Sequence, residues 1–227
     1  MTWELIHTSA PQGIDRGSQG FTTVFMTDGL DPQWRSRLEN LSSYSFNTKT
    51  EPLPVIHRHV TIRVAGQRRH VLTRIEPCGL DYSGRNNRIA HHLLLEQSSC
   101  PPQGPAALLQ VKGLLRSQWS DQPAISPLPP SLPQESCPAM ACSYWAQMTG
   151  DAGHAGHLVR HLQDHPDQQL QLIVPPGTDT LRLFFEAISL LSPADRWRAT
   201  FATAVEQIPT DVSCHWQGII SGSQSIP

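Results

Sequence analysis

A proline-rich stretch constrains the fold of this 227-residue chain more than any other feature. Residues 119–138 contain six prolines, which remove backbone N–H donors and hold the backbone near extended conformations. Such a stretch cannot form a regular helix or a central strand, so we expect it to connect two lobes. The sequence therefore predicts one two-lobed domain over 1–227, with an N-terminal lobe over 1–118 and a C-terminal lobe over 139–222.

The segments on either side of this connection mix hairpins with short helices. Residues 55–75 alternate apolar and polar side chains around a glycine turn, which predicts a β-hairpin. Asp31-Pro32 is typical of a helix start, since a capping carboxylate precedes proline at the first helical position. In the C-terminal lobe we expect a strand over 170–174 and a capped helix that ends near Leu191. Strands and helices do not alternate regularly, which favours an α+β fold with mixed or antiparallel sheets and several short helices.

Several classes of protein are excluded by composition. No apolar run approaches the ~18 residues that a membrane-spanning helix needs, and the N-terminus lacks a signal-peptide pattern. The five cysteines at irregular spacing argue against a disulfide framework and fit reduced thiols. We therefore expect a cytoplasmic protein without a membrane partner.

The common motifs of nucleotide-dependent and hydrolytic enzymes are missing from the sequence. Lys49 and Lys112 are the only lysines, and neither belongs to a GxxxxGK[ST] phosphate-binding loop. The patterns GxSxG and HExxH are also absent. The chain is therefore not itself a P-loop GTPase or ATPase, and we expect no cofactor.

A histidine stripe in the C-terminal lobe has the spacing of metal ligands on a helix. Its members are His154, His157, His161 and His165. Histidines at i and i+4 bind zinc, copper or nickel. However, Gly153 and Gly156 weaken the first turn, and no cysteine or carboxylate completes the stripe. We interpret it as a solvated helix face, and these histidines as only weak metal candidates.

The 55–75 hairpin is also the most basic segment. It contains no acid and carries Arg58, Arg63, Arg68, Arg69 and Arg74. Arginine binds phosphate or carboxylate in bidentate geometry, so this face could contact nucleic acid or an acidic protein. Alternatively, the arginines could protect an exposed edge strand from aggregation. Because nucleic-acid readers usually interleave aromatic residues and the hairpin has none, we favour an acidic partner protein and disfavour nucleic acid.

A polar run leads into an apolar strand over 81–92. Its candidate binding residues are Asp81, Ser83, Arg85, Asn86, Arg88, His91 and His92. Adjacent side chains on a strand point to opposite faces, so we expect that the two histidines are not both core residues and do not line one pocket. One of them could bind a ligand beside Arg85 and Asn86. Alternatively, the loop side chains hydrogen-bond the backbone and set the strand register.

The loop over 174–179 precedes a helix. Because helix N-termini attract anions, this loop could be an anion-binding site. Two prolines in it remove N–H donors, and Asp179 places a negative charge at the end of the helix. A structural cap explains this loop better than an anion site.

An ordered set of segments resembles a known bacterial family. In the N-terminal lobe they are residues 4–13, 17–24, 38–44, Asp81-Tyr82-Ser83-Gly84-Arg85-Asn86-Asn87 and Ala90-His91-His92, and in the C-terminal lobe 175–179, 197–203 and 214–218. Together they resemble the amino-terminal domain, type two, of GTPase-associated protein one, which is found beside GTPase genes in predicted conflict systems. Members are usually longer, with middle and effector-recruiting regions, so the resemblance implies a minimal member or a fragment.

The resemblance implies a non-enzymatic adaptor or regulator that works with a GTPase, or with a neighbouring subunit, in an anti-phage type of conflict system. It makes the 81–92 residues the best candidates for a binding surface or a structural signature, and it supplies no catalytic residues. Two alternatives stay open. One is a hydrolase or transferase that uses His91 or His92 as a base beside Asp81 and Arg85. The other is a nucleic-acid module on the arginine hairpin.

Overall fold

The computed structural model of the chain describes residues 1–44, 53–205, 212 and 214–222. Its strands are β1 (Thr2–Ala10), β2 (Gly20–Thr27), β3 (Ile56–Val64), β4 (Gln67–Leu80), β5 (Asn86–Leu95), β6 (Ala124–Ser126), β7 (Leu170–Val174), β8 (Phe201–Ala202) and β9 (Trp216–Ile220). Its helices are α1 (Pro32–Leu41), α2 (Pro105–Leu109), α3 (Ser143–Thr149), α4 (Gly153–Asp164) and α5 (Thr180–Ser189), with 3-10 turns at Gln97–Ser99 and Arg196–Arg198.

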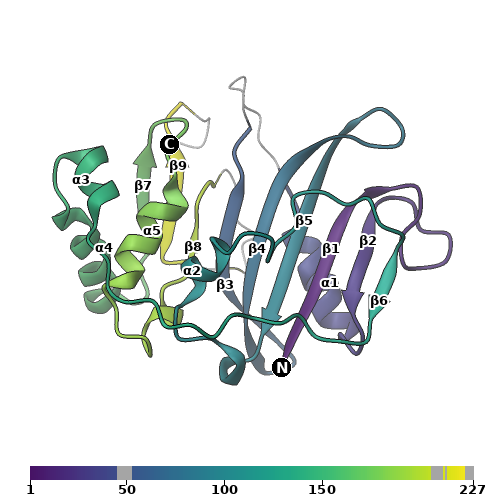
Figure 1. Cartoon of the computed structure of the whole chain (residues 1–227), viewed down its shortest axis with the longest axis horizontal. Coiled ribbons are helices and arrows are strands. Elements are labelled where there is room, and N and C mark those ends of the chain that lie inside the picture. The colour runs from purple at the N-terminus through teal and green to yellow at the C-terminus, as the bar shows by residue number, and fades with distance from the viewer. Residues whose placement is uncertain (45–52, 206–211, 213, 223–227) are drawn as a thin grey trace.

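Within these residues the strands form one mixed sheet in the order β6-β2-β1-β5-β4-β3-β8-β9-β7 (Figure 1). The predicted α+β class is confirmed, and the structure shows a single nine-stranded sheet in place of separate ones. The sheet is continuous through both predicted lobes because β3 pairs with β8, with Arg58 opposite Ala202. The division of the chain into two lobes of one domain stays a prediction.

Local sequence chemistry explains the elements that were predicted. β3 and β4 form the expected antiparallel hairpin, from the pair Ile56 and Ile75 to the turn. The Asp31 carboxylate accepts the Gln33 N–H and caps α1, as expected. Asp179 caps α5 in the same way by accepting the Arg182 N–H. Two elements are short: α2 has five residues and β8 has two.

The sheet is a central layer with helices on both faces (Figure 1). On β5, Leu93 and Leu95 face the core that α2, α3, α4 and α5 cover. Leu94 faces the opposite core, which contains Trp34 and Leu38 of α1. β5 is therefore buried on both faces, although its neighbours pair with it in the antiparallel manner that often leaves one face in water.

The proline-rich connection lies along the sheet. After α2 the chain crosses one face to the far edge, where β6 pairs in parallel with β2 (Figure 1). Proline is tolerated beside such a short edge strand, because one side of an edge strand needs no hydrogen-bond donors. Among the described helices, none has the length and hydropathy that crossing a membrane requires.

Candidate functional site

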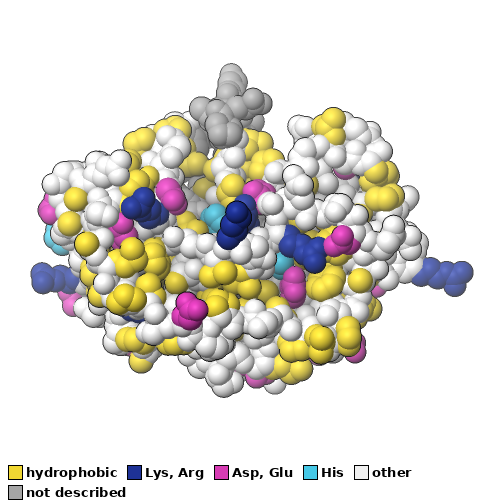
Figure 2. Space-filling view, in the orientation of Figure 1, with side chains coloured by type: hydrophobic (Ala, Val, Ile, Leu, Met, Phe, Trp, Pro, Cys, Tyr) yellow, Lys and Arg dark blue, Asp and Glu magenta, His cyan; other side chains and the backbone are white. Residues whose placement is uncertain are grey.

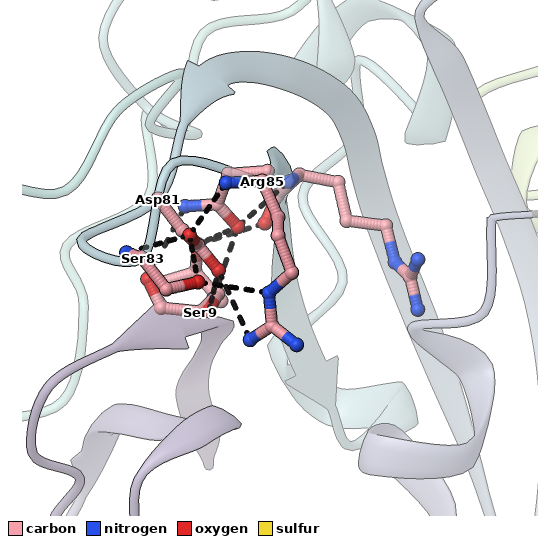
Figure 3. A network of polar contacts seen from close by, with 7 residues as sticks. Ser9, Asp81, Ser83 and Arg85 are labelled. Atoms are coloured by element: carbon pink, nitrogen blue, oxygen red, sulfur yellow. Dashed lines mark hydrogen bonds and ion pairs between the residues drawn. The ribbon is translucent and has the colours of Figure 1, made fainter.

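The turn between β4 and β5 is organised by one carboxylate. Asp81 Oδ1 accepts hydrogen bonds from the Ser83 N–H at 2.8 Å, the Ser83 hydroxyl at 2.7 Å and the Arg85 N–H at 3.0 Å. Asp81 Oδ2 accepts the Ser9 hydroxyl at 2.8 Å, and this contact ties the turn to β1. Figure 3 shows the Arg85 guanidinium folded back over the turn, where its Nε donates to Ser83 Oγ at 2.8 Å.

These contacts hold Asp81 in its charged form. They lower the pKa of its carboxyl group well below the usual range, with the Ser83 hydroxyl as the largest cause and the Arg85 backbone N–H next. The Asp81 side chain is only 3% exposed, whereas the Arg85 side chain is 70% exposed. The carboxylate is thus a structural centre, and Arg85 is the charged group that the turn presents to solvent.

Asn87 fixes the register between β5 and β1. Its Oδ1 accepts the Ser9 N–H at 3.1 Å and the Arg88 N–H at 2.8 Å, and its Nδ2 donates to the Ser9 carbonyl at 3.2 Å. The Thr8 hydroxyl adds a bond to the Arg88 carbonyl at 2.7 Å. These contacts match the interpretation in which polar side chains of this run hydrogen-bond the backbone and set the strand register.

Replacement of Asn87 by alanine tests this role. Asn87→Ala should lower the free energy of unfolding by about 2 kcal/mol, because the Ser9 and Arg88 backbone groups lose their partner in a partly buried position. Urea unfolding checks the value through a lower midpoint at an unchanged slope. Asn86→Ala, at the exposed neighbouring position, is the matched control and should shift the midpoint little. Equal shifts in both variants would contradict the assignment.

His91 and His92 are both fully buried, which corrects the expectation that only one of them could be a core residue. They do point to opposite faces, but each face of β5 is covered. The Arg116 N–H donates to His91 Nδ1 at 2.7 Å, and His91 Nε2 lies 2.8 Å from Glu4 Oε1. His92 hydrogen-bonds the Ser42 hydroxyl at 2.8 Å and the Thr73 hydroxyl at 2.9 Å. Burial lowers the pKa of both rings.

The seven candidates of the 81–92 segment therefore do not form one site. His91 lies five positions along β5 from Asn86, which is about 16 Å at 3.3 Å per residue. A histidine base beside Asp81, as the enzyme alternative requires, is inconsistent with this geometry. Arg88 lies apart from the turn as well, with its guanidinium carbon 4.1 Å from the centre of the Phe21 ring. Ser83, Arg85 and Asn86 remain exposed together.

The arginines of the hairpin do not form one basic face. Arg58 is buried, and its guanidinium donates to the Leu41 carbonyl at 3.3 Å. Arg69 shares that face of the sheet and lies over the Trp3 and Trp34 rings, at 4.3 and 4.7 Å.

The other three hairpin arginines point to the opposite face. They are Arg63 and Arg68, a cross-strand pair at the exposed tip, and Arg74, whose Nε lies 2.8 Å from Glu76 Oε1. In Figure 2 the Lys and Arg side chains of the visible face stand apart from one another. A basic surface along the hairpin, as the sequence suggested, is absent from the described structure because strand alternation splits the arginines between two faces.

The histidine stripe lies on α4 and just after it. The rings of His154 and His157 have centroids 5.6 Å apart, and those of His161 and His165 are 5.3 Å apart. Among the described residues no group of three or more His, Cys, Asp or Glu side chains is placed to hold a metal ion. The stripe thus forms two histidine pairs.

The groove beside the Asp81 turn was not predicted. It has a volume of about 600 Å³ and is lined by 8–12 from the end of β1, by Asp81 and Tyr82, and by 118–123 from the proline-rich connection. Trp119 reaches it from that connection and packs on Phe25 at a centroid distance of 5.9 Å. No local signal could have indicated this groove, since its walls are more than thirty residues apart in sequence.

Two family models match the chain and together cover most of it. Residues 1–136 match the N-terminal domain type 2 of GTPase-associated protein 1, and residues 142–225 match the middle domain of the same protein. The resemblance stated above is confirmed, with one refinement: the segments at 175–179, 197–203 and 214–218 fall in the middle-domain match. No curated protein and no solved structure matches the chain.

Proposed function

Because the chain belongs to the GTPase-associated protein 1 family, we propose that it is a non-enzymatic adaptor that binds a GTPase in a bacterial conflict system of the anti-phage type. The family match carries this proposal, since it extends over an N-terminal domain and a middle domain. Such a role places the protein in the cytoplasm beside its GTPase or a neighbouring subunit, and it requires neither nucleic acid nor a membrane.

The Asp81 turn supports the proposal by presenting a rigid set of contact residues. Tyr82 is 51% exposed, Leu80 is 68% exposed, and the Arg85 side chain is 70% exposed. Tyrosine and arginine are enriched among the residues that dominate binding energy at protein interfaces. The Asp81 carboxylate already holds the backbone of the turn by accepting two N–H groups. The turn therefore needs little ordering when a partner binds, which lowers the entropic cost of association. We therefore place the partner on this turn and the adjacent groove.

Co-elution with a GTPase encoded near the gene for this chain tests the proposal. We expect the purified chain to form a complex with that GTPase in at least one nucleotide state, GTP or GDP. The double variant Tyr82→Ala/Arg85→Ala should weaken the complex by about 30-fold, as removal of one strong contact residue does. The measurement is size-exclusion chromatography followed by calorimetric titration.

The control is a double alanine variant of exposed residues that lie away from the turn. Arg63→Ala/Leu128→Ala removes an exposed arginine at the hairpin tip and a leucine that is 73% exposed, and it should bind like the parent chain. No complex in either nucleotide state would contradict the adaptor role. Normal binding by Tyr82→Ala/Arg85→Ala would contradict the placement of the partner on this turn, but not the adaptor role.

A further inference from the structure

A cavity of about 430 Å³ lies where the two halves of the sheet meet. Residues 53–55 and His57, at the start of β3, form one wall. The second wall is 175–181, which comprises the loop before α5 and its first turn. Residues 203–204 and Ile220 complete the lining. This volume is within the range of pockets that bind small molecules in proteins.

The cavity exists only because two domains contribute to it. The wall at 53–57 belongs to the part that matches the N-terminal domain, and the other lining residues belong to the part that matches the middle domain. The two parts are joined at this point by the bond from the His57 N–H to the Thr203 hydroxyl at 2.9 Å. Domain junctions are a preferred location for ligand sites.

Proline and aliphatic side chains give the cavity its apolar surface. Pro54, Pro175 and Pro176 line it, together with Leu53 and Ile220 among other residues. Among the lining residues that the structure describes, none is Phe, Tyr or Trp. Proline rings pack well against aromatic faces, as they do where proline-rich peptides bind aromatic grooves. An aromatic ring in this cavity would complete such a pairing.

His57 and Asp179, which both line the cavity, carry hydrogen-bond acceptors. Burial, with the nearby Arg74 charge as the second cause, lowers the pKa of His57 to about 4, so its ring is neutral at pH 7 and keeps one nitrogen lone pair. Among the described residues, His57 makes a hydrogen bond with the Thr203 side chain, and this bond uses the His57 backbone N–H and not the ring. Asp179 uses Oδ1 to cap α5, through the Arg182 N–H at 3.0 Å. The described part of the lining contains no Lys or Arg, which disfavours an anion.

We propose that this cavity binds an aromatic ring that carries one O–H or N–H donor, with the ring against the prolines and the donor on His57 or Asp179. The ring could belong to a free small molecule or to a Tyr or Trp side chain of another protein. The proposal stands on the geometry of the cavity and does not depend on the GTPase.

Indole and 1-methylindole test the proposal, because a methyl group replaces the N–H donor in the second probe. In ligand-observed NMR titrations of the full chain we expect indole to bind at about millimolar concentration. 1-Methylindole should bind about 3-fold to 10-fold more weakly, as the loss of one hydrogen bond implies. In the double variant His57→Phe/Asp179→Asn, in which asparagine retains the helix cap, this preference should vanish. Equal binding of both probes to the parent chain would overturn the proposal.

Variants that fill the cavity locate the binding. Val55→Trp and Thr178→Trp introduce a ring from opposite walls at half-buried positions, and each should abolish indole binding while circular dichroism shows a folded chain. Gln163→Trp adds the same ring at an exposed position on α4 and should leave binding unchanged. Retained binding in both filling variants would place the ligand elsewhere. If N-acetyl-tryptophanamide binds more tightly than indole, the cavity is assigned to a protein side chain. If indole binds more tightly, the cavity is assigned to a small molecule.

Discussion

Lowering the pH from 7 to 5 is expected to remove at least about 4 kcal/mol of the free energy of unfolding, which is a large part of the stability of a typical domain. The cause is a set of histidines that the fold buries in the neutral form. Burial lowers the pKa of His7 and His57 from 6.5 to about 4. It lowers the pKa of His59 and His92 well below 6.5. His7 and His57 should each contribute about 2 kcal/mol to the loss, and His59 and His92 add to it in the same direction.

The direction of the change in the free energy of unfolding depends on whether the folded or the unfolded chain binds more protons. Above pH 6.5 these histidines are neutral in the folded and unfolded chain, so their contribution to stability is fully present. As the pH falls below 6.5, the unfolded chain takes up protons that the folded chain excludes, and stability decreases. The decrease from His7 and His57 ends near pH 4, where the folded chain is protonated too. Burial also lowers the pKa of His70, His91 and His215, which adds to the loss in the same direction.

Urea unfolding between pH 8 and pH 5 measures this effect. His7, whose Nδ1 lies 3.1 Å from the Thr23 hydroxyl, provides a single-site test: His7→Gln should reduce the proton uptake on unfolding by about one at pH 5. The exposed His157 is the control, and His157→Gln should retain the parent profile. A free energy of unfolding that stays within about 1 kcal/mol across this range would show that the histidines are not held neutral.

Replacement of Glu186 by alanine is expected to cost about 4 kcal/mol of stability and to release α3 from α5. The Glu186 side chain is fully buried. Its carboxylate accepts the Tyr144 N–H at 3.0 Å and the Trp145 N–H at 3.2 Å, and thereby caps α3. The Cys142 side chain at the N-cap position makes no capping hydrogen bond to the helix. The alanine variant would leave these N–H groups without a partner in a buried position.

The isosteric variant separates charge from geometry. Glu186→Gln keeps one carbonyl acceptor and should cost about half as much, while Glu135→Ala removes an exposed carboxylate and should change little. Hydrogen exchange gives the local readout, since the amides of 143–149 should lose protection while those of β1 and β5 keep it. A loss below about 1 kcal/mol for Glu186→Ala would show that water can replace the carboxylate at this helix end.

The elements that depend on local chemistry were predictable. Asp31 and Asp179 cap their helices as the sequence indicated, and residues 55–75 contain the expected hairpin. For the 81–92 segment, the sequence left two interpretations open, and the Asp81 and Asn87 contacts match the structural one. The groove beside that turn and the cavity at the domain junction had no local signal, because each joins segments far apart in the chain.

By itself the sequence determined the α+β class, the capped helices, the hairpin and the family, because caps, turns and alternation act over a few residues. Only the tertiary structure decided what is buried. Strand alternation indicates which side chains share a face, but it does not indicate whether that face is covered. Helices on both faces of the sheet bury His91 and His92 together, and alternation divides the arginines of the hairpin. Glu186 meets the start of α3 across more than forty residues, a contact that packing alone creates.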